Sequence, residues 1–298
     1  MMILAQSVRK HGSTYQSVYR SIYKKCNHST RSKNLDVIKE QFAHQAKVFE
    51  KSWDSRCVSS NEEIMARVMA HVQHILGKNA KPLKALDVAC GTGIFTRTLS
   101  SHCDQVLGLD VTPEMLAEAK AATNDTKTNI SYIIGDGAAL PFLDSSFDLI
   151  ASRLAVHHFD QPLDQVKEMR RVCKEGVAVV IVDIVCDDNP VISALQNHLE
   201  VLRDPSHTRM LTSSSISELL SSAGLKVFTE KLQFDNILYV DKWLQSTRTP
   251  ENIGIEIINA LQLELTKGEP ITGMQPFEDT NGRLCFIHKY EVVVAEKI

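Results

Sequence analysis

The sequence lacks several features that would assign it to a specialised class of protein. No apolar run approaches the ~18 residues that a membrane-spanning helix requires, so we expect no membrane span. The seven cysteines are scattered and form no C-x-x-C pair, which argues against a disulfide framework and against a metal site. Of the 298 residues, 43% are hydrophobic and 23% are charged, as in ordinary globular proteins. A length of 298 residues allows one large domain with an appendage.

A third glycine is also missing from a loop that has two. A short apolar run at 83–88 predicts a buried strand, and Gly91 and Gly93 allow a tight turn from it into a helix. The dinucleotide fingerprint G-x-G-x-x-G requires a glycine where Thr96 stands, and no phosphate-binding lysine follows the loop. The turn amides and the helix N-terminus favour an oxygen-rich or negatively charged group. We therefore expect this loop to bind a nucleotide-like ligand. The missing lysine argues against a phosphate-binding P-loop, and the missing third glycine argues against a dinucleotide-dependent oxidoreductase.

Two acids accompany this loop. Asp87 lies four residues before Gly91, and Asp110 ends a second apolar run at 106–109. An acid at the tip of a second strand is placed to hold the two hydroxyls of a ribose. Strands and helices alternate from 84 to 183, which predicts parallel βαβ units. Strands are expected near 84–89, 105–109, 130–135, 147–152 and 177–183, and helices near 93–101, 113–122 and 162–173.

The pattern Asp-x-x-x-Gly-x-Gly with a second acid resembles the class I S-adenosylmethionine-dependent methyltransferases. Residues 135–142 resemble the third-strand motif of that family, and 146–150 resemble its fourth strand. Residues 170–183 resemble the following helix and fifth strand. Four motifs in the right order are more specific than any one of them.

The resemblance implies a Rossmann-like α/β fold, with a seven-stranded, mostly parallel sheet and helices on both faces. N-terminal helices and a helical roof would complete it. The cofactor would be S-adenosylmethionine, with Asp110 on its ribose and Asp136 on its adenine amino group. The implied cofactor-binding residues are Asp87, Ala89, Gly91, Gly93, Asp110, Met115, Asp136, Gly137 and Arg153.

The acceptor side is predicted from the residues after the fourth strand. The Asn/Asp-Pro-Pro-Tyr/Phe signature of amide and adenine N-methyltransferases is absent there, which lowers the expectation of a nucleic-acid or glutamine substrate. The pair His157–His158 instead resembles the type-11 branch of ubiquinone/menaquinone-methyltransferase-like enzymes. Quinone C-methyltransferases usually carry Arg-Asn at this place. His158 is a candidate catalytic base; alternatively, both histidines brace the loop beneath the cofactor.

The stretch 197–209 strongly resembles the same His-His branch. It places Arg203, Asp204 and His207 together on a loop after a predicted helix. An acid, a guanidinium and an imidazole can bind an anionic acceptor or relay a proton. We therefore predict Asp204 and His207 as catalytic and Arg203 as substrate-binding. The alternative is a helix-terminal or Asx turn at Asp204, with Arg203 and His207 tying the roof down.

The N-terminal 34 residues differ from the rest in composition. They contain seven lysines and arginines, no acid, and apolar residues at helical spacing, as in a mitochondrial transit peptide. A disordered tail or a basic nucleic-acid-binding arm are the alternatives. Removing these seven of 33 basic residues would leave 26 against 36 acids, which disfavours nucleic acid as a partner. We expect a leader at 1–34, a matrix (otherwise cytoplasmic) location, and a methyltransferase domain at 35–298.

Further helices are predicted around this domain. A helix at 35–53 carries Phe42 and Phe49, which are predicted to bind substrate and to shield the sulfonium, unless they are plain core residues. Other elements expected outside the central alternation are helices at 64–76, 190–202, 213–223, 240–247 and 251–266, and strands at 225–233 and 283–294, the last an edge strand paired with 225–233. The stretches 185–223 and 236–266 are expected to be helical additions on the substrate side.

The expected activity is O- or C-methylation of a small molecule: a phenol, a quinone precursor or a carboxylate. Two alternatives stay open, a mitochondrial protein methyltransferase and a non-catalytic respiratory-complex assembly factor. The expected partner is the small-molecule acceptor; the oligomeric state is left open, a homodimer included.

Overall fold

The structure, a computed structural model, describes most of the chain after the basic N-terminal segment. The described residues are 31–52, 66, 69–70, 83–123, 128–228 and 232–298. Residues 1–30 of the leader expected at 1–34, and most of the helix expected at 64–76, lie outside them.

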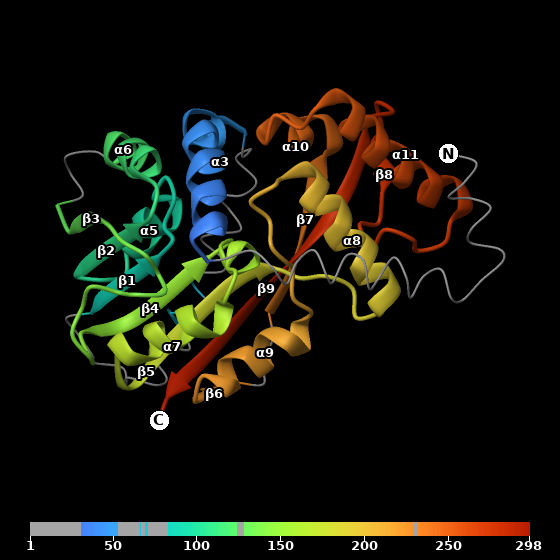
Figure 1. Cartoon of the computed structure of the whole chain (residues 1–298). Helices are drawn as coiled ribbons and strands as arrows, with labels where there is room; N and C mark the ends of the chain where they lie inside the picture. The colour runs from blue at the N-terminus through green and yellow to red at the C-terminus, as the bar shows by residue number, and fades with distance from the viewer. Residues whose placement is uncertain (1–30, 53–65, 67–68, 71–82, 124–127, 229–231) are drawn as a thin grey trace.

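Five parallel strands form one half of the sheet. β1 (Lys84–Val88) lies at its centre, with β2 (Gln105–Asp110) and then β3 (Ile130–Ile134) on one side. β4 (Phe147–Arg153) and β5 (Cys173–Ile184) follow on the other side (Figure 1). Covered on both faces by helices, β1 and β5 are almost fully buried, as their apolar sequences predict. The predicted βαβ alternation is confirmed.

The other half of the sheet is antiparallel and is built around β9 (Leu284–Lys297). β5 pairs with one edge of β9, and β6 (Leu225–Val227) and β7 (Leu232–Tyr239) pair with the other; β8 (Phe277–Glu278) pairs with its beginning. The order β3-β2-β1-β4-β5-β9-β6 confirms a Rossmann-like, mostly parallel sheet, but within the described residues the sheet has nine strands rather than the predicted seven, because β7 and β8 also pair with β9. The predicted pairing of the last strand with residues 225–233 is correct, but its edge position is wrong. Its residues are buried between two neighbours, and alternation alone cannot tell one neighbour from two.

The two faces of the sheet bury alternate residues of each strand. Helices α7 (Pro162–Val172) and α9 (Ser213–Ser222) cover the face to which Leu86 contributes. Helix α5 (Ile94–Leu99) covers the opposite face, to which Ala85 contributes. Because side chains alternate along a strand, one apolar run supplies both layers of the core.

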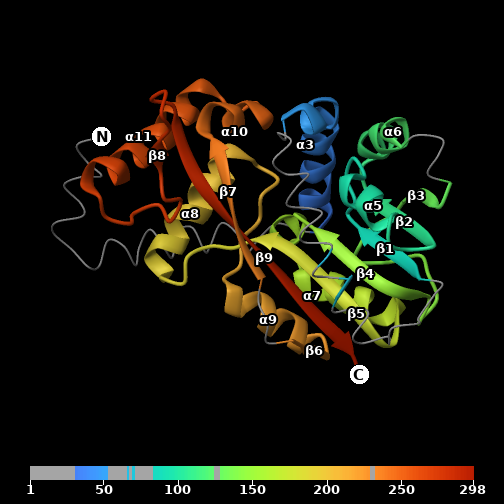
Figure 2. The same cartoon turned by 180° about the vertical axis from the view of Figure 1, so that it is seen from behind.

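A helical lobe extends beyond the sheet and has its own core. Helices α8 (Pro190–Arg203), α10 (Val240–Ser246) and α11 (Glu251–Lys267) pack around the first part of β9 (Figures 1 and 2). The buried apolar residues of this core are Leu199, Val240, Trp243, Leu244, Ile257, Leu261, Met274 and Phe286. Of the two expected helical additions, α8, α10 and α11 lie in this lobe, whereas α9 of the first covers the sheet and residues 236–239 of the second belong to β7.

Helix α3 (Arg31–Ser52) stands between the sheet and the helical lobe. It packs against α6 (Pro113–Ala122) on one side and α10 on the other, as both views show (Figures 1 and 2). The expected boundary at residue 34 falls inside α3. The Asn34 amide donates to the backbone carbonyl of His158 at 3.4 Å. The amino-acid composition changes near residue 34, but the helical hydrogen bonding of α3 continues across that position.

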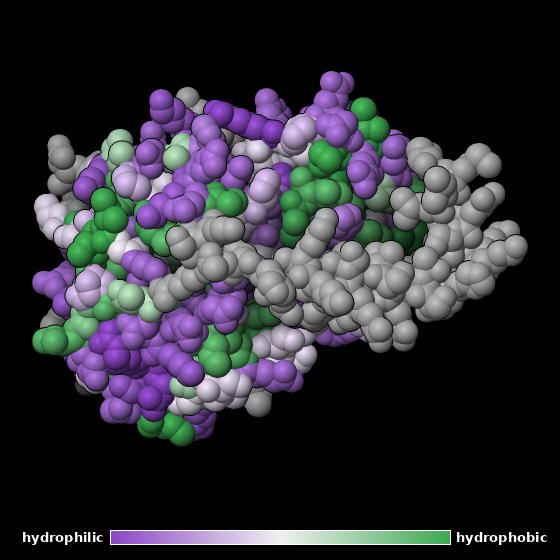
Figure 3. Space-filling view, viewed as in Figure 1, coloured by the Kyte–Doolittle hydropathy of each residue, from purple (hydrophilic) through white to green (hydrophobic). Residues whose placement is uncertain are grey.

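The surface is mixed in character. Figure 3 shows hydrophilic side chains over much of one face, with hydrophobic ones over the helical lobe and in separate smaller groups over the sheet half. Exposed apolar residues of that lobe include Val191 on α8 and Ile255 on α11. Among the described helices, none combines the length and the apolar character needed to cross a bilayer.

Candidate functional site

A cavity lies at the carboxyl ends of the parallel strands, next to the point where the strand order reverses beside β1. Ligands of open α/β sheets bind at such a point. The ends of β1, β2 and β4, the loop after β3 and one face of α3 form its walls. Of the residues predicted to bind the cofactor, those that line it are Asp87, Ala89, Gly91, Asp110, Met115, Asp136, Gly137 and Arg153.

Gly93 is the predicted cofactor residue that does not line the cavity. It caps the N-terminus of α5 with a φ of 76°, in the left-handed region. A Cβ at this position would also overlap the Tyr132 hydroxyl, which bonds to Thr123 at 2.9 Å. Gly93 thus shapes the turn from β1 into α5.

Ala89 adopts a backbone conformation that L-residues avoid. Its φ is 59°, and it is the first residue after β1. A left-handed backbone costs a residue with a Cβ roughly 1–2 kcal/mol. The loop therefore carries strain at the point where it borders the cavity.

We expect Ala89→Gly to raise the free energy of unfolding by about 1 kcal/mol. Glycine removes the backbone strain, but it also raises the conformational entropy of the unfolded chain, which offsets part of the stabilisation. Urea unfolding measures the change. The control is Ala117→Gly at an exposed position of α6, where glycine should lower the free energy of unfolding by about 1 kcal/mol. A similar loss in both variants would contradict the strain.

Asp110 ties the glycine loop to β2. Its Oδ2 accepts from the Gly91 amide and its Oδ1 from the Thr112 amide, both at 2.8 Å. Burial raises the pKa of this carboxyl, and these two backbone amides oppose the rise. Each oxygen keeps a second lone pair, so the carboxylate can still accept from a pair of ligand hydroxyls.

Buried polar atoms without partners line the same cavity. Oδ1 of Asp87, Oγ1 of Thr92 and Oε1 of Gln165 have no hydrogen-bond partner within the described part of the chain. Burial raises the pKa of Asp87 to about 7, although Thr96 donates to its Oδ2 at 2.6 Å. Buried polar groups in native proteins are nearly always hydrogen-bonded. A ligand that carries amine and hydroxyl groups would satisfy them, and S-adenosylmethionine is such a ligand.

One face of α3 supplies an apolar wall. Leu35, Ile38 and Phe42 line the cavity at spacings of three and four residues, which places them on one helical face. The Phe42 ring meets His158 edge-on, with centroids 4.9 Å apart. Leu35 and Ile38 were not predicted as site residues, although their spacing was visible in the sequence. The Phe49 side chain lies outside the described residues.

The two histidines after β4 have different environments. His157 Nδ1 contacts Asp183 Oδ1 at 2.5 Å, and its backbone amide donates to the same carboxylate at 3.2 Å. This contact with the end of β5 braces the loop. His158 lines the cavity, and burial lowers its pKa to about 4. Of the pair, His158 is therefore the one placed to meet a ligand.

Arg203, Asp204 and His207 come together behind His158 and are not among the residues that line the cavity. Arg203 pairs with Glu200 at 3.3 Å and with Asp204 at 3.7 Å. The His207 ring lies 5.1 Å from that of His157, and burial holds its pKa well below the usual value. Arg203 and Asp204 are therefore held within the roof, as the alternative expects, whereas neither ring nitrogen of His207 has a hydrogen-bond partner among the described residues.

Metal-ligating residues do not cluster in the structure. Within residues 31–298, gaps excepted, no group of three or more histidine, cysteine or acidic side chains is arranged to hold a metal ion. The five described cysteines are buried.

Comparison with known proteins agrees with the fold. Residues 86–181 match the family described as "Methyltransferase domain". The chain is 32% identical over 181 residues to the uncharacterized methyltransferase YcgJ of Bacillus subtilis, covering 60% of this chain and 70% of that protein. The crystal structure of YcgJ superposes with a TM-score of 0.65 at 27% identity, over 76% of this chain and 98% of YcgJ. A demethylmenaquinone methyltransferase of Staphylococcus aureus is 38% identical over 106 residues, 35% of this chain and 44% of its own.

A mostly parallel sheet of this strand order, with a cavity at its carboxyl edge, defines a Rossmann-like α/β fold. The chain belongs to the class I S-adenosylmethionine-dependent methyltransferases, and the protein is an enzyme of that class.

Proposed function

We propose that the cavity binds S-adenosylmethionine and that the enzyme transfers its methyl group to a small molecule. The observation that carries this proposal is the meeting of Asp87 and Asp110 at one sheet edge, where both line the cavity and one buried Asp87 oxygen has no hydrogen-bond partner among the described residues. Asp110 would hold the ribose hydroxyls, Asp136 the adenine amino group and Met115 the adenine face. When bound, the cofactor supplies an activated methyl group, so the protein chiefly positions the acceptor and excludes water.

Within this proposal the acceptor is a phenol or a quinone precursor rather than a carboxylate. The charged side chains that line the cavity are Asp87, Asp110, Asp136, Arg153 and Asp160. This excess of acids opposes an anionic acceptor. Arg203, predicted to bind an anion, is instead held by Glu200 and Asp204. The apolar wall of α3 suits an aromatic ring, and a demethylmenaquinone methyltransferase is among the similar proteins.

We also propose a location in the mitochondrial matrix. It rests on the acid-free, basic composition of the N-terminal residues.

The test is calorimetric titration of the full chain with S-adenosylmethionine and with its demethylated product. We expect micromolar binding of both, because the buried polar atoms of the cavity gain partners. Absence of binding by a protein shown to be folded would contradict the proposal and would favour a scaffold or assembly role.

A further inference from the structure

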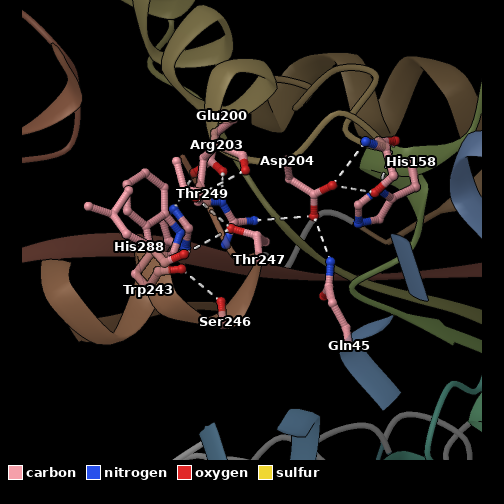
Figure 4. Close-up of polar contacts among 12 residues, drawn as sticks. Gln45, His158, Glu200, Arg203, Asp204, Trp243, Ser246, Thr247, Thr249 and His288 are labelled. Carbon is pink, nitrogen blue, oxygen red and sulfur yellow. Dashed lines mark hydrogen bonds and ion pairs between the residues drawn. The ribbon is translucent and has the colours of Figure 1, made fainter. Parts of the chain in front are cut away.

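A chain of hydrogen bonds runs from the cavity into the helical roof through His158. Its Nδ1 lies 3.0 Å from the Ser206 carbonyl oxygen and 3.2 Å from the Ser206 hydroxyl. That hydroxyl donates to Asp204 Oδ1 at 2.6 Å. Figure 4 shows Asp204 reaching from the end of α8 toward His158 on one side and Gln45 of α3 on the other.

The partners of Nδ1 determine which ring nitrogen of His158 carries the proton. A carbonyl oxygen only accepts, and the Ser206 hydroxyl has already given its hydrogen to Asp204. Nδ1 must therefore be the donor, which leaves Nε2 unprotonated in the neutral ring. Nε2 makes no hydrogen bond to the described residues, and His158 lines the cavity beside Phe42. The ring thus presents a proton acceptor to the cavity.

Asp204 is built to keep a negative charge behind this ring. It is 2% exposed, and its Oδ1 also accepts from the Ser206 amide at 2.9 Å, which closes an Asx turn. Its Oδ2 accepts from Gln45 at 3.3 Å and lies 3.7 Å from the Arg203 guanidinium. Burial opposes ionisation, but His158 and Arg203 outweigh it and hold the pKa of Asp204 below its usual value.

We propose that Ser206 and Asp204 are positioning residues that hold His158 with Nδ1 protonated, so that Nε2 accepts the proton of an acceptor hydroxyl during methyl transfer. This role rests on the proposed function. The acceptor oxygen forms a bond to the methyl carbon while the carbon–sulfur bond breaks and sulfur keeps the electron pair. The hydroxyl proton passes to His158 Nε2, and the resulting imidazolium is stabilised by Asp204 through Ser206 before the proton leaves to solvent. An acceptor that must lose a proton, such as a phenol, uses this unit; a carboxylate does not.

Four ionisable groups face the His158 ring. The rings of His157 and His207 lie 4.2 Å and 6.0 Å away, Asp204 acts through Ser206, and Asp183 lies beyond His157. Burial and His157 lower the pKa of His158, whereas Asp204 and Asp183 raise it. At neutral pH the ring is therefore neutral and Nε2 is available as an acceptor. Loss of the Asp204 charge lowers the pKa of His158 further, because Asp204 raises it.

The test is ¹⁵N NMR of the histidine side chains in the full chain, which distinguishes the two tautomers without any acceptor. We expect His158 to be protonated at Nδ1 in the unmodified protein. In Asp204→Asn, the amide can donate to the Ser206 hydroxyl, whose hydrogen then competes for Nδ1 with donation from Nδ1 to the Ser206 carbonyl, so the Nδ1 resonance should shift partly toward that of an unprotonated nitrogen. The control is Asp241→Asn, which removes an exposed carboxylate paired with Arg283. It should leave the His158 resonances unchanged.

Three results would overturn the proposal: protonation of His158 at Nε2, titration of His158 near neutral pH, or identical His158 resonances in Asp204→Asn and Asp241→Asn. If Asp204→Asn does not fold, Ser206→Ala is used instead, because it removes the hydroxyl that connects Asp204 to His158. The Nδ1 resonance of His158 is then measured in that variant. Calorimetry with the demethylated cofactor is run in parallel. Failure of that binding contradicts the proposed function, whereas the tautomer result tests the positioning role separately.

Discussion

Replacing Asp110 by alanine is expected to weaken binding of S-adenosylmethionine by about 2–4 kcal/mol, the usual cost of losing a bidentate charged hydrogen bond. That corresponds to roughly 30- to 1,000-fold in Kd. The carboxylate lines the cavity, and its two backbone contacts fix it in place, so little reorganisation is needed on binding. Calorimetric titration of the full chain measures the change.

Two variants separate the ribose contact from a loosened loop. Asp104→Ala removes a carboxylate at the opposite end of β2, where it accepts from the Leu83 amide at 2.7 Å. It should leave cofactor affinity unchanged. Asp110→Asn keeps one oxygen as an acceptor but loses the charge, so its affinity should lie between those of the unmodified protein and Asp110→Ala. If Asp104→Ala weakened cofactor binding as much as Asp110→Ala, the loss would come from a disturbed β2 and not from a ribose contact. Unchanged cofactor affinity in Asp110→Ala would refute the ribose assignment.

Replacing Glu200 by leucine is expected to lower the free energy of unfolding by about 3–5 kcal/mol, because it leaves two buried groups without their acid. Glu200 is fully buried; its Oε1 contacts His288 Nε2 at 2.7 Å and its Oε2 lies 3.3 Å from the Arg203 guanidinium. Figure 4 shows the three side chains together beside Trp243, over whose ring Arg203 lies at 4.8 Å. Burial opposes ionisation of Glu200, but Arg203 and His288 hold its pKa below the usual value.

Urea unfolding of the full chain measures this loss. The matched control is Glu256→Leu on α11, where the glutamate is exposed and a change within about 0.5 kcal/mol is expected. A Glu200→Leu protein as stable as the unmodified one would mean that this buried network adds nothing over apolar packing, as happens where whole buried ion pairs are replaced by well-packed apolar groups.

Much of the cofactor half could be predicted from the sequence. The carboxyl ends of parallel strands share one edge of a sheet, so Asp87 after Leu86 and Asp110 after Leu109 had to approach each other once their strands were recognised. The Gly91 turn followed from the same local pattern. Gly93 shows the limit of this reasoning: the motif contains it, but its place at the start of α5 turns it away from the cavity.

The acceptor half depended on contacts between distant segments. Arg203, Asp204 and His207 are neighbours in the sequence, and their residue types alone are compatible with catalysis. Their surroundings depend on distant segments. β9 brings His288 to Glu200, the partner of Arg203, and α3 brings Gln45 to Asp204. Pairings across 88 and 159 positions leave no local periodicity that could reveal them.

The sequence by itself therefore determined the fold class, the alternation of parallel strands with helices and the cofactor edge, because each depends on short-range periodicity and on turn geometry. Only the tertiary structure decided that β9 lies between two neighbours, that α3 walls the cavity, and that the charges of the roof neutralise one another behind His158. These features arise from the burial of surfaces that are far apart in the chain. Their partners are selected by packing and by the cost of leaving a buried charge unpaired.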